Sequence, residues 1–203
     1  MLVIGGDSFS SITNHSLWYD FLFDKKMFKQ KINLARESAG NFYISDSIQN
    51  FVKNNHKSIK KVCIFWSQFH RLDLLVDKPF DKFHTYNGRG CWQFCGGLDT
   101  KSKKWKSLFE SEIKKNSWEG LIQKSLECVE NTHKVLDDLN IDYHFGFVFD
   151  DKNNQKKFLH HRRYIPTIFS NFIKNHNLFG VDNYHPSEQG HKLFAKHIEQ
   201  FIS

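Results

Sequence analysis

The stretch Lys61–Trp66 (KVCIFW) decides the fold class, because it is the clearest β-strand in the sequence. After its lysine it is continuously apolar, without the polar alternation of a strand that has one face in water. Such runs are typical of parallel strands buried on both faces. Shorter apolar runs predict further strands at Met1–Gly5, Lys31–Ala35, Ile141–Phe149 and, briefly, Phe179–Val181.

Segments with apolar residues at helical spacing lie between these runs. They predict helices over about 16–26, 40–54, 117–139, 166–176 and 186–202, with Pro186 in the first turn of the last one. Strands that alternate with helices indicate an α/β protein whose open, mostly parallel sheet is covered on both faces. Residues 77–100 have no clear periodicity and predict a functional loop or lid. We read residues 150–163 as a polar, basic loop.

The composition of the 203 residues suits one domain, 1–203, with the lid as an insertion at about 77–105. The sequence contains 21 Phe, so we expect a core built largely on phenylalanine. No apolar run is long enough to span a bilayer. Met1–Gly5 is too short for the apolar region of a secretory signal, and we therefore expect a cytoplasmic protein.

The formal net charge of +7 permits attraction to polyanions. The lysines are scattered as pairs, for example Lys25-Lys26 and Lys60-Lys61, which favours a solvated surface. We therefore do not expect nucleic acid as a partner, and the sequence leaves the oligomeric state open. The alternative is a polyanion surface on the basic loop Lys152–Arg163.

Four cysteines give no strong metal pattern. Cys91 and Cys95, with His84 nearby, leave a zinc site or a disulfide open as alternatives, but a second close pair is missing. We expect no metal and no organic cofactor.

Two motifs far apart in sequence carry the chemistry. Gly6–Ser10 (GDSFS) follows the first strand and offers Ser8 on a turn, where its glycine permits a tight backbone path. Asp182–Ser187 (DNYHPS) precedes the last helix and offers Asp182 and His185 three residues apart. A hydroxyl nucleophile, an imidazole base and an orienting carboxylate are the groups that a serine hydrolase needs.

On these motifs the chain resembles the SGNH/GDSL hydrolase family, over nearly its whole length. The resemblance implies a flavodoxin-like α/β/α sandwich with a five-stranded sheet, and a triad of Ser8, His185 and Asp182. Asn33-Leu34-Ala35 followed by Gly40 is similar to the family's second block. In that block the glycine N–H, here that of Gly40, is a donor to the oxyanion, and the resemblance makes the N–H of Ser8 the other backbone donor.

The third block departs from the family pattern. Where the family has an asparagine after the third strand, this sequence has Gln68. Its amide is the same donor one methylene longer, so it can complete the oxyanion hole. The alternative is that Gln68 only satisfies backbone groups near a helix start.

Three further residues are candidates for contact with substrate. Arg71 can bind an anionic group or, as we favour, pair with Asp73. Tyr86 and Trp92 can form an aromatic wall that stacks on a sugar, or simply pack in the lid. The resulting hypothesis is a serine esterase for a small or glycan ester such as an O-acylated carbohydrate. A non-catalytic glycan- or polyanion-binding module and an O-acyltransferase remain alternatives.

Overall fold

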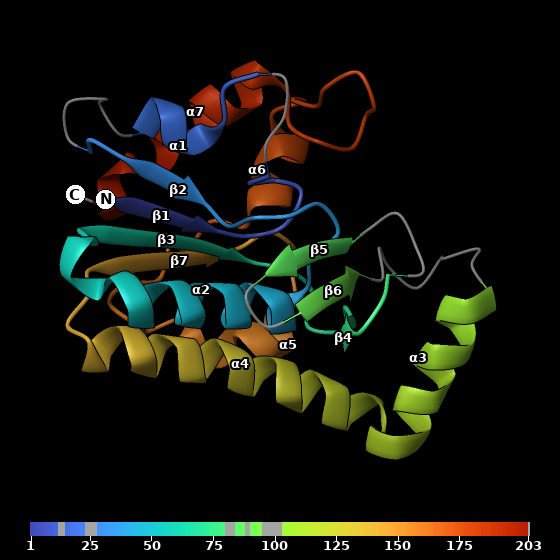
Figure 1. The fold of residues 1–203 in the computed structure, drawn as a ribbon. Coiled ribbons are helices and arrows are strands. Elements are labelled where there is room, and N and C mark those ends of the chain that lie inside the picture. Colours follow the sequence, from blue (N-terminus) through green and yellow to red (C-terminus); the bar gives the residue numbers. More distant parts are fainter. Residues whose placement is uncertain (12–14, 23–27, 80–83, 88–89, 95–102, 203) are drawn as a thin grey trace.

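The structure is a computed structural model that describes residues 1–11, 15–22, 28–79, 84–87, 90–94 and 103–202. Its centre is a parallel sheet with the strand order β2-β1-β3-β7 (Figure 1). The strands are β1 (Leu2–Gly5), β2 (Lys31–Asn33), β3 (Lys61–Trp66) and β7 (Tyr143–Phe147). Helices cover both faces of this sheet, which confirms the predicted α/β/α class.

Side chains of the central strand β3 alternate between two cores. Val62, Ile64 and Trp66 join the core under α2 (Asn41–Asn55) and α4 (Trp118–Asp138). Cys63 and Phe65 join the core on the opposite face. That face carries α1 (Trp18–Leu22), α6 (Phe169–Asn175) and α7 (Glu188–Ile202). Because both faces are buried, β3 needs the uninterrupted apolar run that marks it in the sequence.

Phenylalanines dominate the core beneath α6 and α7. Phe169 and Phe194 stack with their ring centroids 3.7 Å apart, and Phe65 meets both of them edge-on or tilted. Gly146 on β7 leaves the space that Phe65 occupies, because a Cβ there would lie 2.7 Å from its ring. The phenylalanine-rich core that the composition predicted is therefore present.

Serine caps define where two helices begin. The Ser117 Oγ accepts a hydrogen bond from the Gly120 N–H at 3.1 Å and starts α4 at the predicted position. The Ser187 Oγ accepts one from the Gly190 N–H at 3.1 Å. Because Ser187 takes this capping role, α7 begins at Glu188 rather than at the predicted Pro186.

The fifth position of the sheet is reduced to one bridge. Tyr164 pairs in parallel with Phe145 of β7, and the Ile165 N–H donates to the Phe145 carbonyl at 2.7 Å. The brief strand predicted at 179–181 is likewise a single bridge, between Phe179 and Pro186. Each of these two segments makes one bridge and does not extend into a regular strand.

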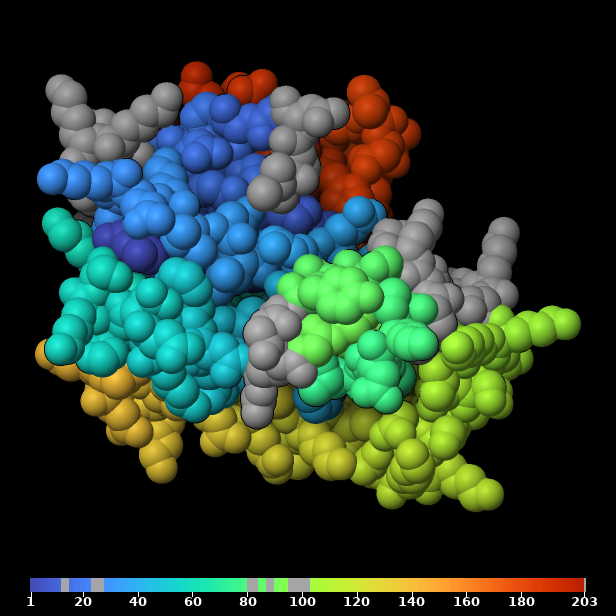
Figure 2. All heavy atoms as spheres, in the orientation of Figure 1, coloured from blue at the N-terminus to red at the C-terminus, as the bar shows by residue number. Residues whose placement is uncertain are grey.

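The predicted loop at 77–100 contains regular structure instead. A second sheet, antiparallel with the order β4-β6-β5, is formed by β4 (Asp73–Val76), β5 (His84–Asn87) and β6 (Gly90–Phe94). It lies next to α2 and residues 31–40 in Figure 2. The sequence interpretation missed these strands because they are short and mix polar with apolar residues. Cys95, and with it the zinc or disulfide alternative, lies outside the described residues.

Two more helical segments were not predicted. The helix α3 (Lys103–Asn116) extends away from the parallel sheet and buries mainly Trp105 (Figure 1). The basic loop at 150–163 contains α5 (Lys152–Gln155) and a 3₁₀ turn, η2 (Lys156–Phe158). Asp151 caps α5 and Phe158 anchors the turn in the core, so this segment is more ordered than its polar composition indicated.

The connections place a crevice at one edge of the sheet. From β1 the chain passes to β2 on one side, and then crosses to β3 on the other side of β1. In open parallel sheets, ligands bind beyond the carboxyl ends of strands at such a reversal. The turns after β1 and β3 therefore meet where a site is expected. In the part of the chain that the structure describes, no helix has the length and apolarity to cross a membrane.

Candidate active site

The turn after β1 presents Ser8 above a buried carboxylate. Asp7 is fully buried, and its Oδ1 accepts a hydrogen bond from the Phe9 N–H at 3.0 Å. Its Oδ2 accepts from the Ser67 Oγ at 3.0 Å and from Arg71 Nη1 at 3.3 Å. Asp7 thus fixes the backbone on both sides of Ser8 and ties this turn to the segment that follows β3.

Arg71 is the cation that neutralises this carboxylate. Its side chain is only 5% exposed, and Nη1 donates to the Ala39 carbonyl at 3.2 Å as well as to Asp7. Burial raises the pKa of Asp7, and the Arg71 charge opposes that rise. The sequence interpretation paired Arg71 with Asp73, and that partner is wrong. Since Arg71 is buried and paired, the structure does not bring it to a substrate.

The loop before α7 holds the second half of the site. His185 Nδ1 lies 2.5 Å from Asp182 Oδ2, and Asp182 Oδ1 accepts the N–H groups of Tyr184 and His185 at 3.0 and 2.9 Å. The hydrogen bond from His185 and those two N–H groups lower the pKa of Asp182 to about 2. Asn183 adopts the left-handed conformation, with φ of 56°, that closes this turn.

Local bonds and one aromatic ring hold this loop in place. The Gly180 N–H donates to the His185 carbonyl at 2.7 Å, and the Asn183 N–H donates to the Gly180 carbonyl at 3.1 Å. Phe9, the residue after Ser8, packs against His185 and Tyr184 with ring centroids 5.8 and 6.1 Å away. Phe9 therefore brings the nucleophile turn and the histidine loop together.

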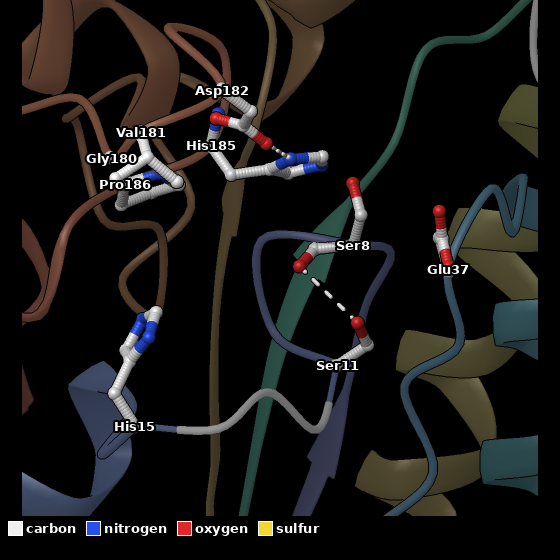
Figure 3. A pocket seen from close by; sticks show the side chains of 9 residues that line it. All are labelled: Ser8, Ser11, His15, Glu37, Gly180, Val181, Asp182, His185 and Pro186. Atoms are coloured by element: carbon white, nitrogen blue, oxygen red, sulfur yellow. Dashed lines mark hydrogen bonds and ion pairs between the residues drawn. The ribbon is translucent and has the colours of Figure 1, made fainter.

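A pocket of about 340 Å³ opens where the two halves meet (Figure 3). The polar side chains on its wall belong to Ser8, Ser11, His15, Glu37, Asp182 and His185. The Ser8 hydroxyl points toward the imidazole of His185 in this view. His185 Nε2, the nitrogen that does not face Asp182, is buried and has no hydrogen-bond partner among the described residues. The structure thus brings the three predicted catalytic side chains to one pocket.

The predicted backbone donor Gly40 is already engaged. Its N–H donates to Asp73 Oδ1 at 2.9 Å, and the Tyr43 N–H donates to Asp73 Oδ2 at 2.9 Å. Asp73 thereby caps the N-terminus of α2 from a distant strand, and burial raises its pKa to about 7. With its N–H bound to a buried carboxylate, Gly40 has no free donor for an oxyanion.

A neighbouring turn residue has the free N–H that Gly40 lacks. Ser38 adopts the left-handed conformation, with φ of 64°. Its N–H has no acceptor among the residues that the structure describes. The adjacent Glu37 lines the pocket. The sequence interpretation missed Ser38 and Glu37, since no signal in the sequence distinguishes them from ordinary polar turn residues.

Gln68 lies in the segment after β3, as predicted. Within the described part of the chain its side-chain amide makes no hydrogen bond, so it does not satisfy backbone groups there. Gln68 is not part of the pocket wall beside Ser8. Its role in an oxyanion hole stays a prediction.

The two aromatic candidates also lie away from this pocket wall. Trp92 of β6 is only 9% exposed and packs edge-on against Tyr43, with ring centroids 6.0 Å apart. Tyr86 of β5 is 65% exposed. Trp92 thus has the packing role that the sequence left open. Among the described residues, no group of three or more His, Cys, Asp or Glu side chains is placed to hold a metal ion.

Comparisons with known proteins add little to this geometry. No family model matches the chain, and no curated protein matches it. One solved structure is similar over 99% of this chain and 98% of its own, with 14% identity and a TM-score of 0.47. It comes from Desulfitobacterium hafniense DCB-2 and is described as a lipolytic protein of the G-D-S-L family. The assignment of a function rests on the site itself.

Proposed function

We propose that this protein is a serine esterase that uses Ser8, His185 and Asp182 as its triad. The arrangement of His185 carries the proposal: one ring nitrogen is bound to Asp182, and the other is buried, has no hydrogen-bond partner among the described residues and lies on the side of Ser8. An imidazole held in this way keeps its proton on Nδ1 and offers Nε2 as a base. A histidine in a purely structural role has no need for this one-sided pairing.

The reaction begins when His185 Nε2 removes the proton from the Ser8 hydroxyl as Oγ attacks the ester carbonyl. Asp182 stays ionised and stabilises the resulting imidazolium. The imidazolium then protonates the leaving alcohol as the acyl-oxygen bond breaks. Water then attacks the acyl-serine while His185 takes its proton, and His185 returns that proton to Ser8 Oγ as the bond between Oγ and the acyl carbon breaks and the acid leaves.

Backbone donors stabilise the negative charge on the carbonyl oxygen. The Ser8 N–H makes no hydrogen bond within the described residues and is the first donor. We place the Ser38 N–H second, in the position that the sequence assigned to Gly40. The unpaired amide of Gln68 is a third candidate. Each such donor contributes about 10² to 10³ in kcat when it is aimed at the developing charge.

The substrate that we propose is a small ester, with O-acyl groups on a carbohydrate as the first class to assay. A pocket of about 340 Å³ lies at the lower end of the roughly 300–1,000 Å³ of ligand sites, which favours a short acyl chain. The open side of the pocket leaves room for a larger alcohol.

Labelling with a fluorophosphonate tests the proposed nucleophile directly. The parent protein should be labelled at Ser8, and Ser8→Ala should not be. Ser11→Ala is the matched control, because Ser11 also lines the pocket but its hydroxyl donates a hydrogen bond to the Ser8 carbonyl at 3.3 Å. Ser11→Ala should still be labelled at Ser8. If the parent is not labelled and hydrolyses no ester, the alternative of a non-catalytic binding module stands.

A further inference from the structure

The charge of the pocket is opposite to the charge of the chain. The protein carries a net charge of +7, yet no lysine or arginine lies among the described residues that line the pocket. Two carboxylates, those of Glu37 and Asp182, lie on its wall. Asp182 is bonded to His185, so the carboxylate left to interact with a ligand is that of Glu37.

Glu37 and Pro186 lie on opposite sides of Ser8, and both line the pocket. Figure 3 shows Ser8 between Glu37 and the loop of Gly180, Val181 and Pro186. Glu37 is exposed and forms no ion pair with any residue in the described part of the chain. An ester bound at Ser8 therefore has a free negative charge at one flank.

The nearest arginines along the chain are bound to other groups. The Nη1 of Arg36, the preceding residue, donates to the Ala35 carbonyl at 2.8 Å, and its Nε lies 3.4 Å from Thr85 Oγ1 on the small sheet. Arg71 is buried and bound to Asp7. Neither of them lines the pocket.

We infer that Glu37 determines the charge preference of the proposed esterase, which favours cationic over neutral over anionic esters. The inference rests on the proposed function. Opposite charges attract and like charges repel across a short distance, and salt screens both effects where the groups are exposed. The polyanion or acidic glycan of the sequence-based alternative is then excluded from this pocket, even though the protein surface is basic.

A pair of isosteric esters measures this preference. Acetylcholine and 3,3-dimethylbutyl acetate differ in the positive charge of the alcohol and little in its shape. The parent should hydrolyse the cationic ester with a kcat/KM about three- to tenfold above that of the neutral one. Glu37→Gln should bring this ratio close to one, and added salt should lower the ratio in the parent alone.

A second pair, one anionic and one neutral ester, tests whether the pocket disfavours negative charge. The parent should hydrolyse p-nitrophenyl hemisuccinate more slowly than p-nitrophenyl butyrate, and Glu37→Gln should reduce that difference. Glu119→Gln, which removes an exposed carboxylate that is not on the pocket wall, should keep the ratios of the parent.

The outcomes separate this inference from the proposed function. If the parent hydrolyses esters and Ser8 is labelled, but Glu37→Gln keeps the parent's ratios, only the charge preference is overturned. If Ser8 is not labelled and no ester is hydrolysed, the proposed function is wrong and the charge preference is overturned with it.

Discussion

The two halves of the candidate site are built in opposite ways. The nucleophile turn rests on buried charged groups: Asp7 bonds to Ser67 and Arg71, which are 60 and 64 residues away along the chain. The Asp182–His185 pair lies on a partly exposed loop and is held by bonds within Gly180–Pro186. The nucleophile turn depends on the whole fold, whereas the Asp182–His185 pair depends mainly on its own turn. Substitutions beneath the nucleophile turn should therefore change stability, and substitutions in the Asp182–His185 pair should change catalysis with little effect on stability.

The largest expected effect lies where the halves meet. Ser8→Ala should lower kcat by roughly 10⁴ to 10⁶, because attack and proton transfer need both groups. His185→Ala should cost a similar factor, and the double variant should cost little more than either single one, since the two act as a unit. Both effects are read from ester hydrolysis by folded proteins with unchanged circular dichroism. Additive losses would show that the two halves do not work together.

The next effect tests the self-contained half. Asp182→Asn should lower kcat by about 10⁴, because an amide no longer selects the tautomer with the proton on Nδ1. The melting temperature near pH 7 should change little, since Asp182 is half exposed. The hydrogen bonds lower the pKa of Asp182 to about 2, so its contribution to stability is present above the unfolded value of 3.8 and is lost as pH falls toward 2. A large loss of stability at pH 7 would contradict the view that this loop is self-contained.

The contacts inside the local half could be predicted from the sequence. Asp182 and His185 are three residues apart, and a turn at that spacing brings a carboxylate to an imidazole without knowledge of the fold. The strand 61–66 and a helix over about 117–139 were likewise predicted, because a doubly buried strand and apolar residues at helical spacing leave local signals.

The buried half could not be predicted in the same way. The sequence favoured Asp73, two residues away, as the partner of Arg71, whereas the tertiary structure pairs Arg71 with Asp7, 64 residues away along the chain. The N–H of Gly40 is bonded to Asp73, 33 residues away, so a donor expected from a motif is already occupied. The strands β4, β5 and β6 were missed because they are short and mix polar with apolar residues, and Trp92 and Phe94 of β6 are buried only through the core that α2 shares with them.

The third effect tests the buried half. Arg71→Met should destabilise the protein by about 3–5 kcal/mol, because it leaves the Asp7 carboxylate buried without its cation. Adding Asp7→Asn should recover part of that loss, since no unpaired charge then remains. Urea unfolding of the parent, both single variants and the double variant measures this coupling. If the double variant loses the sum of the single losses, Arg71 and Asp7 do not form the energetic unit that the structure shows.

A smaller effect on catalysis is expected at Gln68, after β3. If its unpaired amide reaches the oxyanion, Gln68→Ala should lower kcat by about 10² and change KM much less, because the donor acts when charge develops. Gln68→Asn tests the reach of the shorter amide. A kcat within about threefold of the parent would leave the N–H groups of Ser8 and Ser38 as the donors.

The last prediction concerns stability and not catalysis: a change in pH dependence at Asp73, which caps α2 from within the buried half. Burial raises its pKa to about 7, above the unfolded value of 3.8. Between these values the folded state holds a proton that the unfolded chain has lost, so this group makes the free energy of unfolding fall as pH rises from about 4 to about 7. Asp73→Asn should be less stable overall, because one amide oxygen cannot accept the N–H groups of both Gly40 and Tyr43. In Asp73→Asn the free energy of unfolding should nevertheless no longer fall between pH 4 and pH 7, whereas the exposed control Asp138→Asn should keep that fall.

Urea unfolding across pH 4–8 measures how the free energy of unfolding changes with pH in each protein. An unchanged slope in Asp73→Asn would mean that Asp73 is ionised throughout this range. The α2 cap would then be anionic in the folded protein, stabilised by the helix N-terminus despite its burial.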